Sequence, residues 1–439
     1  MDQTYVGVAG FVIFIGLMLV RVPVAFAMAF VGTAGLTYVY GFGTVVKFIP
    51  LEIYTHTSTF TLSALPLFLL MGYLAFYADL SKDSFDAARA WFGKVPGGLA
   101  IATVYACAVF GACSGSSLAE CAVFSKIAVP EMTSRGYNKR LALGVVASAG
   151  GLDVLIPPSI GLVIYGVLTE TSIGSLLIAG ILPGIVYAII FAVAIGLFCW
   201  LKPSYAPKAA DIDTSWRARL NAVRKMWAVS LLFSLVLGSI YFGWATPDEA
   251  AGVGVVGSFL LVVIRGKFRW KELMTATLEA AKASAVIFLI LGTASVFTKF
   301  IMVTGAVSAL TGWIMNLQLP FWGIIVSLCI LWFILGCFID AMSMMILTLP
   351  LAVPLVQAHQ VDMVWFGIVM TMTMVIGTVS PPFGLNCFVM KAALGDRVDL
   401  QDIFIGSIPF VLLMFLIVAI LIIFPQISLY LPNLMAANR

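Results

Sequence analysis

Charged side chains are scarce in this chain. Of its 439 residues, 10% are charged and 62% are hydrophobic. A soluble globular domain needs far more polar surface than this, so the composition excludes that class of protein. Apolar runs long enough to cross a bilayer recur from one end of the sequence to the other. The sequence therefore predicts an all-α, polytopic membrane protein.

Histidine is nearly absent, and cysteine lacks the spacing of a metal or disulfide site. The two histidines, His56 and His359, lie far apart, and the seven cysteines lie in apolar surroundings. The sequence also lacks His-Glu-x-x-His, Gly-x-Ser-x-Gly and a Walker lysine loop. We therefore expect a protein that is not an enzyme and holds no resident cofactor. No nucleic acid is expected among its partners.

Basic residues are concentrated in two stretches, 202–225 and 265–271. Lysine and arginine mark the cytoplasmic side of bacterial-type membranes. Two apolar stretches, about 226–243 and 249–264, separate these clusters, so both clusters can lie on that side. The first cluster is also interpreted as the linker between two halves of the chain.

The two halves resemble one another. LFLLMG at 67–72 corresponds to IFLILG at 287–292, IPPS at 156–159 to SPPF at 380–383, and IAGILP at 178–183 to FIGSIP at 404–409. Matches in the same order and at a nearly constant offset indicate an internal repeat.

Charge indicates that the repeats are inverted. Segments 79–96 and 131–140 each contain three basic residues, whereas the corresponding segments 304–320 and 357–362 contain no lysine or arginine. Equivalent flanks are therefore expected on opposite sides of the membrane, as in many secondary transporters. Each stretch between such flanks would begin and end on one side, which predicts two re-entrant hairpins. These are placed at about 98–130 and about 321–356.

Two adjacent prolines interrupt a span in each half. Proline lacks an amide hydrogen and clashes with the preceding turn, so Pro157 and Pro158 should split one span into two half-helices. The prolines of SPPFGLN (380–386) should split the other. A break frees carbonyls for a cation, and the next helix N-terminus, at Ser159, suits an anion. A purely structural kink is the alternative.

The predicted organisation has four parts. They are N-terminal scaffold helices (1–60), a first repeat (61–200) with its broken helix at about 141–168, a cytoplasmic linker with scaffold helices (201–283), and a second, inverted repeat (284–439) with its broken helix at about 362–394.

Hydroxyl residues gather at the predicted tip of the first hairpin, in GACSGSSLAECA (111–122). The hydroxyls and carbonyls of Ser114 to Ser117 are hard oxygen ligands for a small cation. A close-packing patch of small residues is the alternative. The second hairpin has Asp340 and Ser343 in the corresponding place.

Three carboxylates stand in apolar context: Glu120, Asp153 and Asp340. An ionisable residue at membrane depth is a candidate functional group. The alternative is a structural partner for each, such as Lys126 for Glu120.

Three motifs carry a resemblance that extends over essentially the whole chain. GACSGSSLAECAVFSKIAVPEMTSRGY, LIPPSIGLVIYGVLTETSIGSLLIAGILPG and TVSPPFGLNCFV resemble signatures of the large, DctM-like membrane subunit of tripartite ATP-independent periplasmic (TRAP) transporters. The resemblance implies a protein of the ion-transporter superfamily in the bacterial inner membrane. It implies sodium-driven import of a small organic acid by an elevator, in which a transport domain slides against a scaffold. The implied partners are a periplasmic substrate-binding protein and a small four-helix membrane subunit.

By position, the resemblance also implies two sodium sites and a substrate site near both hairpin tips. One sodium site would use Ser114, Gly115, Ser116, Ile156 and Pro157, and the other Gly336, Asp340, Thr378, Ser380 and Gly384. The substrate would contact Ser116, Ser117, Ser159, Ser343, Pro382 and Asn386.

The sequence departs from the family pattern at two acids. Glu120 stands where a small or hydroxyl residue is expected, and Asp153 where glycine is expected. We hypothesise that these acids serve a substrate with an amino group or add proton coupling. Two other functions stay open: a stand-alone sodium–dicarboxylate symporter without a binding protein, and a membrane scaffold that transports nothing.

Overall fold

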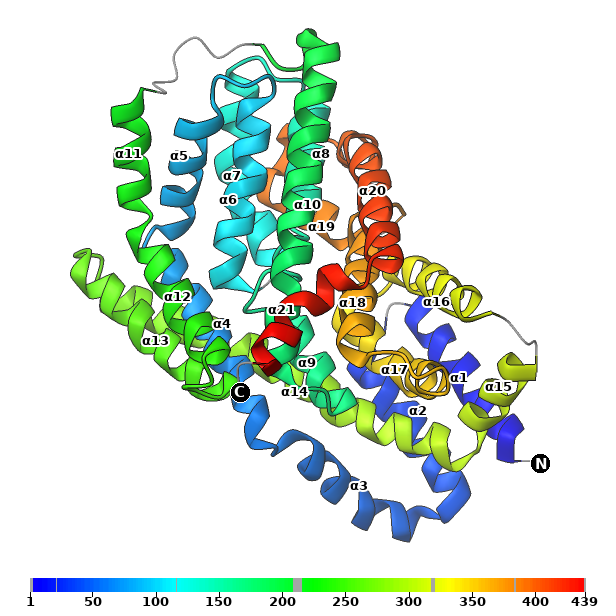
Figure 1. Cartoon of the computed structure of the whole chain (residues 1–439). Coiled ribbons are helices and arrows are strands. Elements are labelled where there is room, and N and C mark those ends of the chain that lie inside the picture. The colour runs from blue at the N-terminus through cyan, green and yellow to red at the C-terminus, as the bar shows by residue number, and fades with distance from the viewer. Residues whose placement is uncertain are drawn as a thin grey trace. The chain divides into compact units, whose positions relative to one another are not determined.

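The computed structural model describes residues 3–20, 22–115, 117–207, 215–316, 320–382 and 384–437, in which all regular structure is helical (Figure 1). The α-helices are α1 (Gln3–Leu19), α2 (Val24–Tyr40), α3 (Phe42–Thr57), α4 (Ala64–Tyr77), α5 (Leu80–Phe92), α6 (Gly98–Ser114), α7 (Ser117–Ser134), α8 (Lys139–Ala149), α9 (Ile160–Thr169), α10 (Ile173–Leu201), α11 (Trp216–Lys225), α12 (Trp227–Tyr241), α13 (Pro247–Ile264), α14 (Trp270–Val303), α15 (Ala306–Asn316), α16 (Phe321–Gly336), α17 (Ala341–Gln357), α18 (Met363–Val379), α19 (Leu385–Leu394), α20 (Leu400–Ile423) and α21 (Gln426–Ala437). Short 3₁₀ turns are η1 (Phe60–Ser63), η2 (Pro203–Tyr205) and η3 (Gly395–Arg397).

Several helices are long and apolar enough to cross a bilayer. Five spans in the described residues meet this condition: Phe60–Tyr77, α10, α13, α14 and α20. The bent pair α11 and α12 raises the number to as many as six. The prediction of an all-α, polytopic membrane protein is confirmed. The inverted orientation of the repeats stays a prediction.

The chain divides into two compact units. The first unit comprises Met1–Ser63, Ala281–Leu331 and Met342–Val361, and the second unit comprises Ala64–Ala280, Trp332–Ala341 and Asp362–Arg439. The second unit therefore contains the first predicted hairpin and both predicted broken helices.

In the first unit, α2 packs closely on the part of α14 that belongs to it. A Cβ added to Gly32 would lie 2.9 Å from the backbone of Phe297, so the two helix backbones nearly touch. The ring of Phe14 on α1 lies 5.0 Å from the ring of Phe297. Small residues permit such approach where helices pack without a hydrophobic driving force from water.

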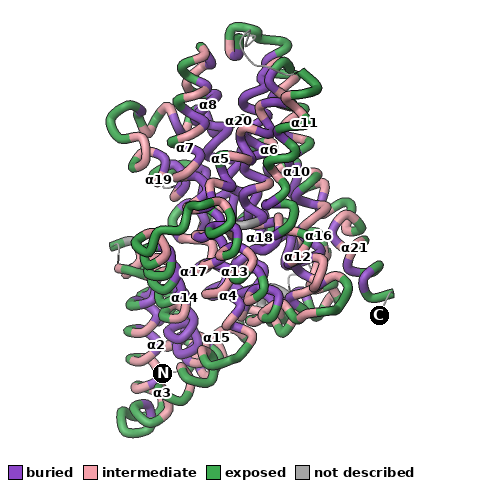
Figure 2. Tube along the Cα trace, turned by 90° about the vertical axis from the view of Figure 1, so that its left-hand side faces the viewer, coloured by how far each residue is buried: buried purple, intermediate pink, exposed green. Residues whose placement is uncertain are grey.

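In the second unit, α6, α8 and α18 are buried over most of their lengths (Figure 2). Helices α8 and α20 are in close backbone contact, because a Cβ added to Gly144 would lie 1.9 Å from the carbonyl oxygen of Gly406. The ion pair of Arg140 and Asp402, 2.9 Å long, lies one turn away on the same two helices. These contacts hold α8 and α20 in one register.

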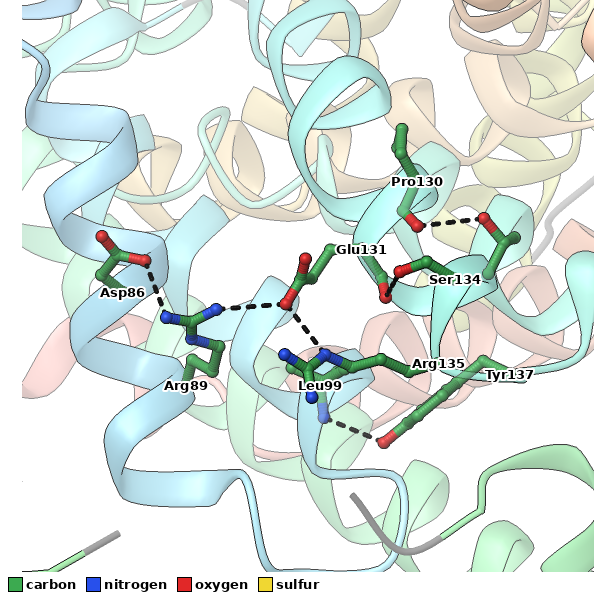
Figure 3. Close-up of polar contacts among 9 residues, drawn as sticks. Asp86, Arg89, Leu99, Pro130, Glu131, Ser134, Arg135 and Tyr137 are labelled. Carbon is green, nitrogen blue, oxygen red and sulfur yellow. Dashed lines mark hydrogen bonds and ion pairs between the residues drawn. The ribbon is translucent and has the colours of Figure 1, made fainter. Parts of the chain in front are cut away.

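The two arms of the first hairpin, α6 and α7, are joined at their far ends (Figure 3). The backbone N–H of Leu99, at the start of α6, donates to the hydroxyl of Tyr137, just beyond α7, at 3.2 Å. Glu131 on α7 pairs with Arg89 of α5 at 3.1 Å and with Arg135 at 2.9 Å. The start of α6 and the chain just beyond α7 are thus held together by the Leu99–Tyr137 bond, while Glu131 ties the end of α7 to α5.

The first break begins earlier than predicted. The prolines were expected to end the first half-helix, but α8 ends at Ala149 and the break runs through 150–159, with Pro157 and Pro158 at its far end. Gly150 and Gly151 have low helix propensity, and a Cβ on Gly151 would lie 2.6 Å from Val375 Cγ1. In the second broken helix the prediction holds, because α18 continues to Val379 and ends just before Pro381.

Arg265 links the ends of several helices in the second unit. Its Nη1 pairs with Asp83 and donates to the carbonyl oxygen of Ala78 at 2.9 Å, and its side chain is 17% exposed. Replacing Arg265 with alanine leaves these partners unsatisfied, so we expect a loss of about 2 kcal/mol of unfolding free energy. Thermal denaturation of the variant and the wild type in detergent measures this loss of stability.

Arg269→Ala is the matched control for Arg265. Arg269 pairs with Glu272 in the next turn, and its side chain is 76% exposed. An exposed pair of this kind contributes about 0.5 kcal/mol or less. An equal loss of stability in both variants would contradict the role of Arg265.

Candidate functional site

The tip of the first hairpin meets the first break. Gly115 lies between α6 and α7 with φ of +60°, and a Cβ added there would lie 2.8 Å from the carbonyl oxygen of Pro158. Glycine alone combines this left-handed backbone with so close an approach. The structure thus brings together Gly115 and the proline pair, two parts of the first predicted sodium site. We call this contact the first junction.

Other predicted residues of the first junction are only partly described. Ser116 and the side chain of Ser114 lie outside the described residues. Ile156 packs against α10, where a Cβ on Gly184 would lie 2.6 Å from its Cγ1. Because its side chain is apolar, Ile156 could offer a cation only its carbonyl oxygen. Ser117 is half-buried at the start of α7.

The helix α9 starts from the break with a capped N-terminus. Ser159 is buried, and its Oγ accepts a hydrogen bond from the backbone N–H of Leu162 at 3.3 Å. This is the usual role of an N-cap serine. The free amides and dipole of the first turn of α9 still favour an anion, as predicted for Ser159.

A second junction forms where the end of α16 meets the second broken helix. A Cβ added to Gly377 on α18 would lie 2.5 Å from the Cα of Gly336, so the two backbones are in contact. Across the break, a Cβ on Gly384 would lie 2.9 Å from the carbonyl oxygen of Ser380 and 3.0 Å from that of Thr378. Four predicted ligands of the second sodium site therefore lie in this one junction: Gly336, Thr378, Ser380 and Gly384.

The hydroxyls of the second junction are oriented by their own helix. Thr378 Oγ1 donates to the carbonyl of Val375 at 2.8 Å, and Ser380 Oγ donates to that of Ile376 at 2.7 Å. Each hydroxyl hydrogen is thus engaged, and the oxygen lone pairs remain as acceptors. Such oxygens can serve a hard cation.

Asn386 fastens the two broken helices to each other. Its buried side chain donates from Nδ2 to the carbonyl of Ala147 at the end of α8, at 3.3 Å. The backbone carbonyl of Asn386 accepts a hydrogen bond from the thiol of Cys121 on α7, also at 3.3 Å. Asn386 was predicted as a substrate contact, whereas Cys121 was missed, because nothing in the sequence pairs positions 265 residues apart.

Three predicted residues are not brought into the contacts above. Pro382 is exposed beside the second break, Asp340 is half-buried, and Ser343 is buried on α17 in the first unit. Their roles stay predictions.

The alternative interpretation of Glu120, a structural ion pair with Lys126, is wrong. Glu120 is fully buried, and neither of its carboxylate oxygens has a hydrogen-bond partner, whereas Lys126 is exposed. Among the described residues, no group of three or more His, Cys, Asp or Glu side chains could hold a metal ion. Ion coordination at the two junctions would therefore rest mainly on backbone and hydroxyl oxygens.

Comparison with known proteins decides the family. The model of the tripartite ATP-independent periplasmic transporter, DctM component, matches residues 11–427. The chain belongs to this family. As a TRAP large permease component, it is a multi-pass transport protein of a membrane and one part of a tripartite assembly.

Relatives of this TRAP permease differ in their named substrates. It is 33% identical to the C4-dicarboxylate TRAP transporter large permease protein DctM of Pseudomonas aeruginosa, over 88% of this chain and 90% of that one. It is 28% identical to the ectoine TRAP transporter large permease protein TeaC of Halomonas elongata, over 96% and 97% of the two chains.

The fold of this TRAP permease is also found outside close sequence relatives. The structure of the Alcanivorax borkumensis YdaH transporter superimposes with a TM-score of 0.62, covering 89% of this chain and 90% of that chain at 12% identity. At that identity the likeness concerns the fold alone.

Proposed function

We propose that this chain is the large permease of a sodium-coupled importer of a small organic acid. It would work in the bacterial inner membrane as an elevator, with a small four-helix membrane subunit and a periplasmic substrate-binding protein. The observation that carries the proposal is the pair of junctions. In each, the end of a hairpin arm reaches the interruption of a broken helix, where backbone carbonyl oxygens lie close to a glycine.

Sodium coupling is supported by the chemistry of these junctions. At the first, the carbonyl oxygen of Pro158 faces Gly115, and at the second, those of Thr378 and Ser380 converge on Gly384. Small hard cations prefer such oxygens. Irregular backbone at membrane depth is tolerated where it lines a cavity or is buried in protein. Discontinuous helices in secondary transporters bind coupling ions in this way.

An organic acid is supported by the helix N-terminus at Ser159. The first turn of α9 presents amides and the positive end of a helix dipole beside the first junction, which favours a carboxylate. The relatives named for C4-dicarboxylate and ectoine give the range of small solutes to test.

An elevator is supported by the contacts that join the first hairpin to both broken helices. The first hairpin and both broken helices belong to the second unit, fastened by Asn386 and by the α8–α20 contact. Such a group of helices can move as one body. In the proposed cycle it would carry substrate and sodium between the two sides of the membrane.

Partner dependence is tested first. Native mass spectrometry of the chain, gently extracted from its membrane, is expected to show a stoichiometric small helical subunit. Purified permease and binding protein are then placed in vesicles with a radiolabelled C4-dicarboxylate or ectoine outside. A bare chain that imports either solute without a binding protein would favour the stand-alone symporter.

Sodium dependence is tested in the same vesicles. Replacing external sodium with choline is expected to lower uptake to the level of protein-free vesicles, because no sodium gradient is then present to drive solute uptake. An inward sodium gradient should accumulate solute above its external concentration. Uptake that is equally fast in choline would contradict sodium coupling, and uptake of neither solute under any condition would favour the scaffold.

A further inference from the structure

Two buried acids lie behind the first junction. Glu120 is on α7, one turn after the hairpin tip, and Asp153 is in the middle of the first break. Both are 0% exposed, and none of their four carboxylate oxygens has a hydrogen-bond partner. Asp153 is close enough to act electrostatically on Glu120. A Cβ on Gly111 would lie 2.9 Å from the Cα of Asp153, so α6 presses on this segment.

The groups around the two acids are neutral. Cys107 on α6 and Tyr187 on α10 lie close enough to both acids to interact with them electrostatically. Cys121 on α7 lies close enough to Glu120 to do the same. The Tyr187 hydroxyl donates to the carbonyl of Ser148, so it is not turned to a carboxylate.

On α19 and α8, which pack against α7, the described basic side chains have other partners. On α19, Cys387 is a thiol next to Cys121, and Lys391 donates to the carbonyls of Gly395 and Val398 at the far end of that helix. On α8, the basic residues Lys139 and Arg140 pair with Asp402. No ion pair among the described residues includes Glu120 or Asp153.

Two ionised carboxylates cannot share such a place. Burial disfavours the charged form of a carboxyl group, and a second carboxylate nearby disfavours it further. A proton relieves both penalties without needing space. A bound metal cation would need about six oxygen ligands, whereas the side chains that interact with these acids are thiols and an engaged phenol. The arrangement therefore fits a proton better than a metal ion.

We propose that Glu120 and Asp153 together form a proton-binding site behind the first junction, and that this site is linked to sodium binding at that junction. The second half of this inference rests on the proposed sodium coupling. The chemistry is simple. A proton from water joins one carboxylate to give a carboxylic acid, and it returns to water when that group ionises, with no other bond formed or broken.

The link to sodium follows from charge. Loss of the proton leaves a negative charge close to the carbonyl oxygens of the first break, which favours a cation there. By thermodynamic reciprocity, a sodium ion at the junction must favour release of the proton. Raising the pH should therefore strengthen sodium binding.

Infrared spectroscopy tests the proton site without sodium. The purified complex at neutral pH, in choline buffer, is expected to show the carbonyl stretch of protonated carboxyl groups. Glu120→Gln and Asp153→Asn should each reduce this band. Glu131→Gln is the matched control, because Glu131 lies on the same helix but forms ion pairs with Arg89 and Arg135. It should leave the band unchanged.

The result is decisive even when a variant fails to fold. Wild-type protein labelled with ¹³C in the glutamate or aspartate carboxyl shows which acid carries the proton, because the labelled band moves to lower frequency. A wild-type spectrum at neutral pH without any protonated carboxyl band would overturn the proposal. A band that is equally strong in both folded variants would also overturn it.

Sodium addition tests the link. In weakly buffered solution with a pH indicator, sodium chloride is expected to release up to about one proton per chain from the wild type, and none from the Glu120→Gln, Asp153→Asn double variant. Choline chloride is the salt control. Thermal stabilisation by sodium without proton release would overturn the link. An intact infrared band with no response to sodium of any kind would refute sodium coupling and leave the proton site standing.

Discussion

Replacing Gly144 with alanine is expected to cost about 3 kcal/mol of unfolding free energy or more. The new methyl group would lie 1.9 Å from the carbonyl oxygen of Gly406, so α8 and α20 would have to separate. Separation would also stretch the Arg140–Asp402 ion pair and move α8, which leads directly into the first break. Thermal unfolding of the purified complex, followed by intrinsic fluorescence, measures the loss.

Gly252→Ala is the matched control for Gly144. Gly252 lies on α13 in the same unit, and a Cβ added there meets nothing within 4 Å. Because alanine has the higher helix propensity, this variant should be as stable as the wild type or slightly more stable. Equal stability of Gly144→Ala and Gly252→Ala would show that the α8–α20 contact does not determine the fold of the second unit.

Replacing Gly115 with alanine is expected to weaken sodium-driven uptake about tenfold or more. Alanine in the left-handed conformation costs about 1–2 kcal/mol, and its methyl group would press on the carbonyl oxygen of Pro158 at 2.8 Å. A cost of about 1.4 kcal/mol corresponds to a tenfold change in an equilibrium constant. The measurement is the sodium concentration that gives half-maximal uptake in vesicles.

Gly266→Ala separates the cost of the left-handed backbone at Gly115 from the cost of the contact with Pro158. Gly266 also has a left-handed backbone, with φ of +64°, but a Cβ added there meets nothing within 4 Å. It should lose stability by a similar amount while its sodium dependence stays that of the wild type. Sodium dependence that changes equally in both variants, or in neither, would show that the contact between the hairpin tip and the break does not form an ion site.

The two predicted hairpins coincide with pairs of consecutive helices, and their re-entrant course stays a prediction. The predicted bounds of 98–130 and 321–356 correspond to α6 with α7 and to α16 with α17. Apolar runs and small, polar interruptions such as Ser114–Ser117 are local features, and local features decide where a helix begins and ends. The sequence was less successful at the first break, where it placed the interruption at Pro157 rather than at Gly150. Proline is the stronger local signal, but two glycines and a close contact ended the helix first.

For the candidate site, the sequence likewise predicted individual residues but not the contacts between them. The residues of the second junction were predicted individually, and the structure added that Gly336 touches Gly377 and that two carbonyl oxygens converge on Gly384. The bond between Asn386 and Ala147 joins positions 239 residues apart, and no pattern in one sequence reports such a pair.

By itself, the sequence determined that this protein is a helical membrane protein, and it singled out the proline pairs, the candidate hairpins and the two acids Glu120 and Asp153. These properties follow from hydropathy and from the backbone preferences of proline, glycine and serine. The tertiary structure alone decided that Glu120 and Asp153 lie together without partners, and that the first tip meets the carbonyl of Pro158. The reason is physical: the free energy of a buried charge depends on the neighbours that folding brings to it, and those neighbours come from α6, α8 and α10 rather than from the adjacent residues of the chain.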